Sequence, residues 1–319
     1  MPSRFSTSLL SFMVTVSIFR PNRCRKSFRS LIFGNANQFT NPMIQDIYPH
    51  RFSNLYLANR TLQENDYIFH YQGNTLLLKT KGDELAIPQT KDFQEITPET
   101  DFVFLFMLDE VPCFLVWDEL KADKTPFAFT DISFFRTTTQ REIGWVSLVG
   151  LHLRNWYRQN RFCGKCGATT QHKTDERAVV CPACNTVVYP KISPAIIVAI
   201  VCNDQILLAR NANFTGGWYS LVAGYVDVGE TLEETVCREV KEEVGLDVWN
   251  IRYYKSQSWE LSGSMMIGFI AEANEDQPIC IDDKEITDAA WFRRGNLPNH
   301  PSNISIAGEM IGKFERGEL

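Results

Sequence analysis

The chain has 319 residues, of which 44% are hydrophobic and 22% are charged, and its net charge is −6. This composition is that of a globular protein with room for two domains, and it excludes a largely disordered chain. The acidic balance argues against a broad nucleic-acid-binding surface, but it allows an enzyme that handles one phosphate group through metal ions.

Residues 1–42 differ from the rest because they contain six basic residues and no acidic one. Their apolar run, residues 9–19, is too short to span a bilayer, so we expect no membrane association. We interpret residues 1–42 as a non-globular N-terminal extension or a misassigned start, with Met43 opening the globular part. A mitochondrial transit peptide and a disordered tail are the alternatives.

Residues 43–145 have the pattern of a small α/β domain, and none of their polar residues has catalytic spacing. Short runs rich in β-branched and aromatic residues predict strands at 55–57, 67–71, 75–78, 102–108 and 113–117. We expect residues 72–74 to form a hairpin turn. Apolar residues at helical spacing predict a helix from Trp145 to Tyr157.

Two Cys-x-x-Cys pairs follow that helix, Cys163 with Cys166 and Cys181 with Cys184, separated by fourteen residues. This spacing is typical of a zinc site. Four thiolates would fill all tetrahedral positions, so we expect the zinc to be structural and residues 146–190 to form a linking helix and a zinc ribbon. A redox dithiol is the competing interpretation. The nine cysteines are too scattered for a disulfide framework, which favours a reducing, cytoplasmic location.

Residues 191–319 predict a second, larger domain. The continuous apolar run 195–201 is typical of a strand buried on both faces. Further strands are expected at 205–210, 218–222, 249–259, 265–272 and 290–292, with a loop at 211–217 and a C-terminal helix at 305–314.

The most informative stretch is a predicted helix, residues 231–244. Thr231 is a good N-cap, and Glu234 three residues later completes a capping box. Apolar residues recur every four positions from Leu232, and Gly245 stands where a helix commonly ends in the left-handed conformation.

Glu239, Glu242 and Glu243 share one face of that helix. Like charges at this spacing repel by about 0.2–0.5 kcal/mol per pair on an open helix, so a divalent cation would explain them better. Carboxylate oxygens suit Mg²⁺ or Mn²⁺. We expect Arg238 to pair with Glu230 and brace the helix against the preceding loop. A solvated acidic helix is the competing interpretation.

The complete pattern, from Gly224 through Glu230 and Arg238-Glu239 to Glu242-Glu243 and Gly245-Leu246, resembles the Nudix box. The resemblance implies an α/β/α sandwich with a mixed sheet, preceded here by the small α/β domain and the zinc ribbon. In that family the box is a loop–helix–loop that binds Mg²⁺ or Mn²⁺ and hydrolyses a diphosphate joined to a nucleoside.

The zinc ribbon and residues 256–264 resemble the NADH pyrophosphatase (NAD⁺ diphosphatase) subgroup, whose motif is S-Q-P-W-P-F-P-x-S. Here Ser258, Glu260 and Ser262 replace prolines, and Leu261 replaces the phenylalanine. Loss of prolines frees backbone conformations, and leucine cannot stack as a ring does. Since Glu260 would also add a negative charge beside an anionic substrate, we expect weakened or altered NAD(H) specificity.

The resemblance also implies residue roles. Catalytic roles fall on Glu230, Arg238, Glu239, Glu242 and Glu243, with Glu243 orienting or deprotonating the attacking water. Catalytic metals would be held by Glu239, Glu243, Glu285 and the main chain at Ala223. Substrate contacts are implied for Glu176, Tyr189, Gln257, Ser258, Trp259, Glu260, Leu261, Ser262, Gly263, Ser264 and Ala307.

The implied reaction is hydrolysis of NAD(H) to NMN(H) and AMP, with an NAD cap on the 5′ end of RNA as a further substrate, in a homodimer. One alternative is a Nudix hydrolase for ADP-ribose or another nucleoside diphosphate derivative. The other is a non-catalytic nucleotide- or RNA-binding module. The intact Arg238-Glu239 and Glu242-Glu243 argue against that module, which has no need of metal carboxylates.

Overall fold

The structure, a computed structural model, describes residues 43–319 apart from 83, 122–125, 213–216 and 282–283. The described residues belong to one compact unit. The interpretation of residues 1–42 therefore lies outside the described residues. Met43 itself is 1% exposed and packs with residues of the C-terminal helix.

The N-terminal part contains two four-stranded sheets and two short 3₁₀ helices. The first sheet has the order β1 (Phe52–Ser53), β6 (Phe102–Leu108), β7 (Val111–Val116), β2 (Tyr67–Phe69). The second contains β3 (Tyr71–Gln72), β4 (Thr75–Lys81) and β5 (Glu84–Ala86), with β8 (Phe127–Asp131) also paired to β4. The 3₁₀ helices are η1 (Thr90–Asp92) and η2 (Ile132–Arg136). The predicted hairpin turn between β3 and β4 is confirmed, and β6 and β7 pair in antiparallel fashion.

Two strand predictions in this part are wrong. Residues 55–57 are not a strand; Tyr56 instead donates its hydroxyl to the carbonyl of Lys173 at 3.0 Å, so side-chain contacts hold this segment. The predicted strand 67–71 is interrupted at the buried His70, whose Nδ1 lies 3.2 Å from the Val116 carbonyl. Because β2 and β3 on either side of it join different sheets, the chain must turn there.

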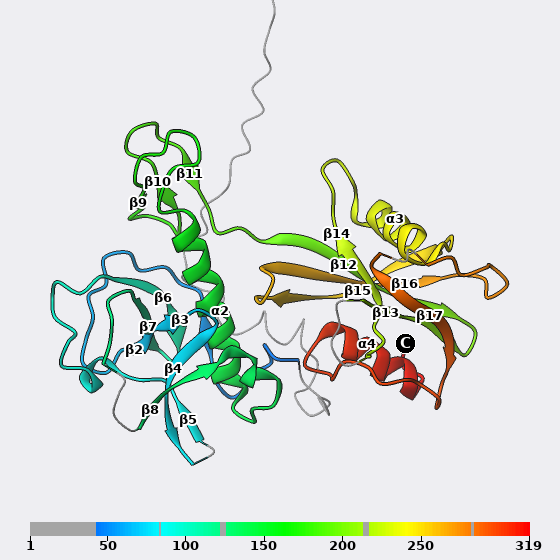
Figure 1. The fold of residues 1–319 in the computed structure, drawn as a ribbon, viewed down its shortest axis with the longest axis horizontal. Coiled ribbons are helices and arrows are strands. Elements are labelled where there is room, and N and C mark those ends of the chain that lie inside the picture. Colours follow the sequence, from blue (N-terminus) through cyan, green and yellow to red (C-terminus); the bar gives the residue numbers. More distant parts are fainter. Residues whose placement is uncertain (1–42, 83, 122–125, 213–216, 282–283) are drawn as a thin grey trace, which may run out of the picture. The chain divides into compact units, whose positions relative to one another are not determined.

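The helix α2 (Arg141–Gln159) begins four residues before the predicted start and leads into the zinc ribbon (Figure 1). Its apolar side chains pack with both N-terminal sheets in one core cluster. The hydroxyl of Tyr71 on β3 donates to the α2 carbonyl of Ser147 at 2.7 Å, and this bond satisfies a buried polar group. The ribbon is a three-stranded sheet with the order β11 (Val187–Val188), β10 (Val179–Val180), β9 (Gln171–His172).

The C-terminal part is built on a six-stranded mixed sheet. Its strands follow the order β15 (Trp249–Trp259), β16 (Ser264–Glu272), β12 (Ser193–Cys202), β13 (Gln205–Asn211), β17 (Ile286–Arg293), with β14 (Val222–Tyr225) also paired to β12. Strands β12 and β16 are parallel, and the other pairs are antiparallel. The predicted strand 218–222 is displaced, because Ala223 and Gly224 themselves pair with β12. The predicted loop 211–217 lies partly outside the described residues.

Helices α3 (Leu232–Val244) and α4 (Ile306–Arg316) cover opposite faces of this sheet (Figure 1). Ile196 and Val198 of β12 pack in the cluster that contains the apolar stripe of α3. Ile197 and Ala199 pack in the cluster that contains α4. Successive side chains of a strand point to opposite faces, so this alternation confirms the predicted α/β/α sandwich and a β12 buried on both sides. No helix in the described part of the chain is long and apolar enough to cross a membrane.

Candidate active site and zinc site

The start and end of α3 follow the predicted local signals. Thr231 Oγ1 accepts a hydrogen bond from the Glu234 amide at 3.2 Å, and the Glu234 carboxylate accepts one from the Thr231 amide at 2.7 Å. Gly245 ends the helix with a φ of 76°. The caps fix the two ends of α3, and Val236, Val240 and Val244 pack in the core cluster of the sheet and so set the direction of the glutamates.

Arg238 braces this helix, as predicted. Its Nε and Nη2 donate to the two carboxylate oxygens of Glu230 at 2.5 and 2.9 Å. Its Nη1 donates to Glu239 at 2.8 Å and to Glu242 at 3.0 Å, and its Nη2 also reaches the Tyr225 carbonyl. The Arg238 guanidinium holds the pKa of Glu230 down at about 2. One cation therefore ties the loop, β14 and two glutamates of the box together.

Gly224 on β14 makes room for Glu239. A Cβ atom at Gly224 would lie 1.9 Å from the Glu239 carboxyl carbon, so the Glu239 carboxylate could not keep its present position. Burial raises the pKa of Glu239, although Arg238 opposes the shift. The glycine of the box thus allows a carboxylate to lie directly against the strand.

Glu243 is the most unusual side chain of the site. It is 8% exposed, and among the described residues nothing donates a hydrogen bond to its carboxylate. Burial, with the nearby charges of Glu239 and Glu285, raises the pKa of Glu243 to about 8. A buried carboxylate without a partner is costly, and a divalent cation is the chemistry that would relieve it. The carboxylates of Glu239, Glu243 and Glu285 are therefore candidates to hold a divalent cation, although they are not gathered within 4.8 Å of one another as the four cysteines are.

Glu243 lines a cavity of about 570 Å³ between β-strands of the sheet and the start of α4. Four other predicted site residues line it too: Ala223, Gln257, Trp259 and Ala307. The remaining predicted residues are not among its lining: Glu176, Tyr189, Glu230, Arg238, Glu239, Glu242, Ser258, Glu260, Leu261, Ser262, Gly263, Ser264 and Glu285.

The cavity also receives residues that the sequence did not single out. Arg136, at the end of η2, brings a cation from the N-terminal part, and Trp218 adds an indole. The Arg136 guanidinium lies 4.7 Å from the centre of the Phe135 ring, and Phe135 packs edge-on against Trp259. Arg136 stands about a hundred residues before the box, and no local pattern marks it, because only tertiary packing brings it here.

Gln257 lines the cavity but is 1% exposed, and its amide is engaged within the protein. Its Nε2 donates to Gln45 Oε1 at 2.9 Å and to the Ile304 carbonyl at 3.0 Å. Its Oε1 accepts from the Ile306 amide at 2.7 Å, which satisfies an orphan donor at the start of α4. Gln257 therefore ties β15 to α4 and to the N-terminal segment.

Glu260 does not point its charge into the cavity. Its carboxylate accepts hydrogen bonds from His152 Nδ1 on α2 and from the Ser258 hydroxyl. His152 Nε2 lies 2.9 Å from the Lys191 carbonyl, so both ring nitrogens face acceptors. The hydrogen bond to Glu260 raises the pKa of His152. The segment lacks the prolines that would stiffen its backbone, and the contact of Glu260 with His152 ties it to α2 instead.

Glu176 and Tyr189 form a pair at the zinc ribbon. The Tyr189 hydroxyl donates to Glu176 at 3.0 Å, and Lys173 Nζ donates to the same oxygen at 2.6 Å. Both residues have exposed side chains. Within one chain they contact each other and do not line the cavity of Glu243.

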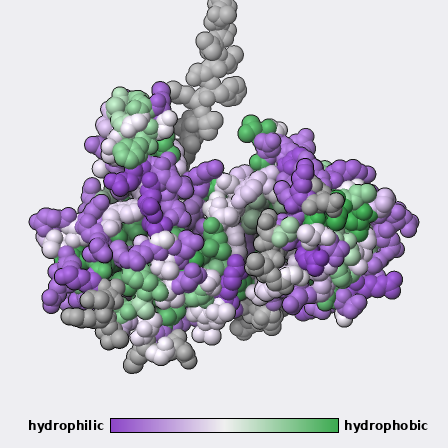
Figure 2. Space-filling view, viewed as in Figure 1, coloured by the Kyte–Doolittle hydropathy of each residue, from purple (hydrophilic) through white to green (hydrophobic). Residues whose placement is uncertain are grey.

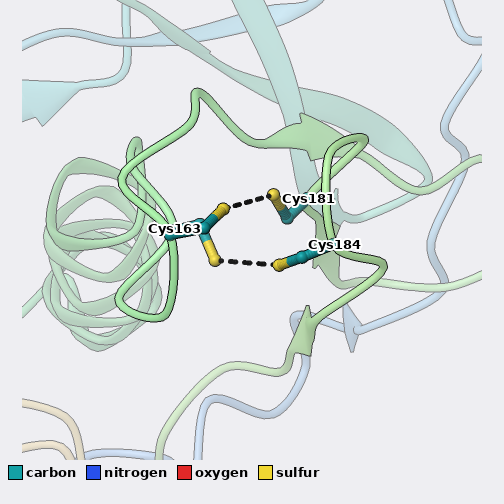
Figure 3. A group of neighbouring side chains, drawn as sticks. Cys163, Cys181 and Cys184 are labelled. Carbon is teal, nitrogen blue, oxygen red and sulfur yellow. Dashed lines mark hydrogen bonds between the residues drawn. The ribbon is translucent and has the colours of Figure 1, made fainter.

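The four predicted cysteines converge, and Figure 3 shows Cys163, Cys181 and Cys184 close together. Their sulfur atoms all lie within 4.8 Å of one another, with 3.6 Å between Cys163 and Cys184 and 3.4 Å between Cys166 and Cys181. The Thr186 hydroxyl lowers the pKa of Cys184 to about 6, which favours the thiolate. In the described part of the chain no other group of three or more acidic, histidine or cysteine ligands is gathered this closely. The cluster fits a structural zinc ion.

Three family models match the chain in sequence. Residues 65–156 match the NADH pyrophosphatase-like rudimentary NUDIX domain, residues 158–189 the NADH pyrophosphatase zinc ribbon domain, and residues 191–311 the NUDIX domain. The NAD-capped RNA hydrolase NudC of Stutzerimonas stutzeri is 40% identical over 209 residues, which are 66% of this chain and 72% of that protein.

The chain belongs to the NADH pyrophosphatase group of the Nudix family. A second similar protein is the NAD-capped RNA hydrolase NudC of Pseudomonas aeruginosa. It is 43% identical to this chain over 172 residues. That match covers 54% of this chain, which spans 60% of that relative's length. A Nudix hydrolase of known crystal structure from Nitrosomonas europaea is 20% identical, with a TM-score of 0.43 over 49% of this chain and 90% of its own.

Proposed function

We propose that this protein hydrolyses the diphosphate of NAD(H) to NMN(H) and AMP, and that it removes NAD caps from RNA 5′ ends. The observation that carries the proposal is Glu243: a buried carboxylate without a hydrogen-bond donor, lining a cavity, with a pKa of about 8. Burial beside the charges of Glu239 and Glu285 makes this carboxylate ready to take up positive charge, from a metal ion or from the proton of a water. Membership of the NADH pyrophosphatase group supports the choice of substrate.

The proposed metal is Mg²⁺ or Mn²⁺, held by Glu239, Glu243, Glu285 and the carbonyl of Ala223. When bound, it would neutralise charge on the phosphoryl oxygens and lower the pKa of a water. The zinc of the four cysteines is separate and structural, since the thiolates leave no open position for substrate.

The protein's own groups then act on the diphosphate. Glu243 accepts the proton of the attacking water, whose oxygen forms the new bond to phosphorus. The bridging P–O bond breaks, and its electron pair leaves with the other phosphate. Arg238 keeps Glu239 and Glu242 in place through its bonds to Glu230 and to the β14 carbonyl. In the cavity, Trp259 and Ala307 offer apolar surface to a ring of the substrate.

We also propose the other substrate contacts implied by the resemblance, at Ser258 to Ser264 and at Glu176 and Tyr189. A homodimer would reconcile the last two with their place at the zinc ribbon, because a second copy would bring them to a neighbouring cavity. The ribbon has exposed apolar side chains at Phe162, Val187 and Tyr189, and Figure 2 shows hydrophobic colouring over this segment. The scattered cysteines support the cytoplasm as its location.

Two other functions compete with this one. A Nudix hydrolase for ADP-ribose would use the same glutamates, and the altered residues Ser258, Glu260, Leu261 and Ser262 favour it. A non-catalytic nucleotide- or RNA-binding module would have no use for the braced glutamates. The surroundings of Glu243 argue against that module, because a binding surface has no need of a carboxyl group placed where burial and two other glutamates disfavour its charge.

Product analysis separates these functions. Purified protein with Mn²⁺ or Mg²⁺ is given NADH, NAD⁺ and ADP-ribose in parallel. NMNH and AMP from NADH at the highest kcat/KM support the proposal. A tenfold preference for ADP-ribose, which is about 1.4 kcal/mol, would contradict the substrate but keep the reaction. Absence of metal-dependent turnover on all three would favour the binding module.

A further inference from the structure

A second pocket of about 680 Å³ adjoins the cavity of Glu243. It lies between the segment that joins η2 to α2 and the loop before α4. The two hollows share three lining residues, Arg136, Trp218 and Pro301. The second hollow is therefore within reach of a group that extends from a diphosphate at Glu243 past Arg136, and we call it the entrance pocket.

The charge of the entrance pocket is opposite to that of the chain. Arg136, Arg141 and His300 line it, and none of its lining residues in the described part of the chain is an aspartate or a glutamate, although the whole chain carries a net charge of −6. Asn299 and Asn303 add amide groups. Guanidinium and amide groups donate hydrogen bonds, and such donors are suited to a phosphate group.

Trp218 and Arg136 stand at the junction of the two hollows. Trp218 is 41% exposed, so part of its indole is open to a ligand. Arg136 rests on the Phe135 ring and makes no ion pair with an acidic group among the described residues. An open indole beside an unneutralised guanidinium is the combination that binds a base by stacking and its phosphate by charge.

We propose that the entrance pocket binds the ribonucleotide that follows the adenosine of an NAD-capped RNA. This inference rests on the proposed function, which places the diphosphate at Glu243. NADH has no such nucleotide, so the pocket would distinguish a capped RNA from the free dinucleotide. The base would stack on Trp218, and the phosphate that joins it to the cap would face Arg136 and Arg141.

The test compares kcat/KM for an NAD-capped RNA trinucleotide with kcat/KM for NADH. In Trp218→Ala and Arg136→Gln we expect the ratio of capped RNA to NADH to fall at least about fivefold. Arg141 lines the entrance pocket but not the cavity of Glu243, so the ratio should also fall in Arg141→Gln. The controls are Trp249→Ala and Arg252→Gln, two exposed residues of β15 that line neither hollow, and their ratios should stay at the wild-type value.

Equal losses on both substrates would overturn the inference, because the pocket would then hold part of NADH itself. An unchanged ratio in all three variants would also overturn it. A binding measurement separates this failure from failure of the proposed function: anisotropy of the 3′-labelled, NAD-capped trinucleotide with Glu243→Gln protein, which needs no turnover. Weaker binding when Trp218→Ala or Arg136→Gln is added supports the pocket even if the reaction is wrong. Unchanged binding refutes it.

Discussion

The four cysteines and the three glutamates are both candidate metal ligands, but the chain prepares them differently. The cysteine sulfurs already lie within 4.8 Å of one another, on turns around a small sheet. The carboxylates of Glu239, Glu243 and Glu285 are not gathered in this way, and two of them have raised pKa values. A zinc site closed by four thiolates stabilises the fold. Carboxyl groups with raised pKa values in a cavity are instead typical of a functional site, where a metal ion or a substrate can bind.

Among the changes that test this comparison, removal of the Glu243 carboxylate should cause the largest loss of activity. Glu243→Gln keeps the size of the side chain but cannot accept the proton of water. We expect kcat on NADH to fall by about 10²–10⁴-fold, the usual contribution of a general base, while the fold is kept. Glu233→Gln, at an exposed position in the first turn of the same helix, is the matched control. Near-normal kcat in Glu243→Gln would assign the base elsewhere.

A methyl group at Gly224 should displace Glu239 without touching its chemistry. The added Cβ would lie 1.9 Å from the Glu239 carboxyl carbon, so the side chain must move. We expect about a hundredfold loss of kcat/KM, since small misplacements of reacting groups have effects of that order. Gly164→Ala is the control, because its Cβ would meet no atom within 4 Å. Equal activity of both variants would show that Glu239 is not needed in its present position.

Loss of one thiolate should act on stability instead of chemistry. Cys181→Ser should release zinc and lower the Tm by several degrees, since the energy of metal binding contributes to folding. Cys237→Ser, at an exposed single cysteine, should change neither zinc content nor Tm. If the refolded Cys181→Ser protein kept its Tm but lost kcat, zinc would have to act at the reacting phosphate, and the two sites would no longer differ in role.

The smallest expected effect concerns the ion pair between His152 and Glu260. Because the pKa of His152 is raised in the folded protein, its contribution to stability is present below pH 6.5 and is lost as the pH rises through the folded-state value. We expect Glu260→Gln to lower the Tm slightly at pH 6 and to raise KM for NADH a few-fold, with both effects shrinking at high pH. Asp247→Asn breaks an exposed pair with Lys241 and should do almost nothing. A pH-independent effect would mean that the pair does not position the segment.

Much of the site was predictable because its signals are local. Thr231 with Glu234, and Gly245, act within one helix, so the sequence alone sets its ends. The pairing of Arg238 with Glu230 also spans few residues. The burial of β12 on both faces was also predictable, because its residues form one continuous apolar run. Alternate residues of that run pack in the clusters of α3 and of α4.

The rest depends on contacts between distant segments. His70 breaks a run of strand-forming residues because its neighbours join two different sheets, which no local pattern records. Arg136 reaches the cavity of Glu243 through the packing of Phe135 against Trp259. Glu260 contacts His152, which stands 108 residues away on α2. Tertiary partners of this kind decide the role of a charge, and the sequence does not reveal them.

The most direct test of the account measures how the Tm of the metal-free protein depends on pH, because that dependence reports the protonation of Glu243. The pKa of Glu243 is about 8 in the folded protein and near 4.5 in the unfolded chain. The folded state therefore holds this proton more tightly, and its stability falls as the pH rises from about 4.5 to 8. Glu243→Gln has no such proton to lose. Its Tm advantage over wild type should grow from pH 5 to pH 8, then level off, and it should shrink when Mn²⁺ is added to both proteins. A Tm difference that is constant with pH and unaffected by Mn²⁺ would contradict the claim that Glu243 has a raised pKa and binds the metal ion.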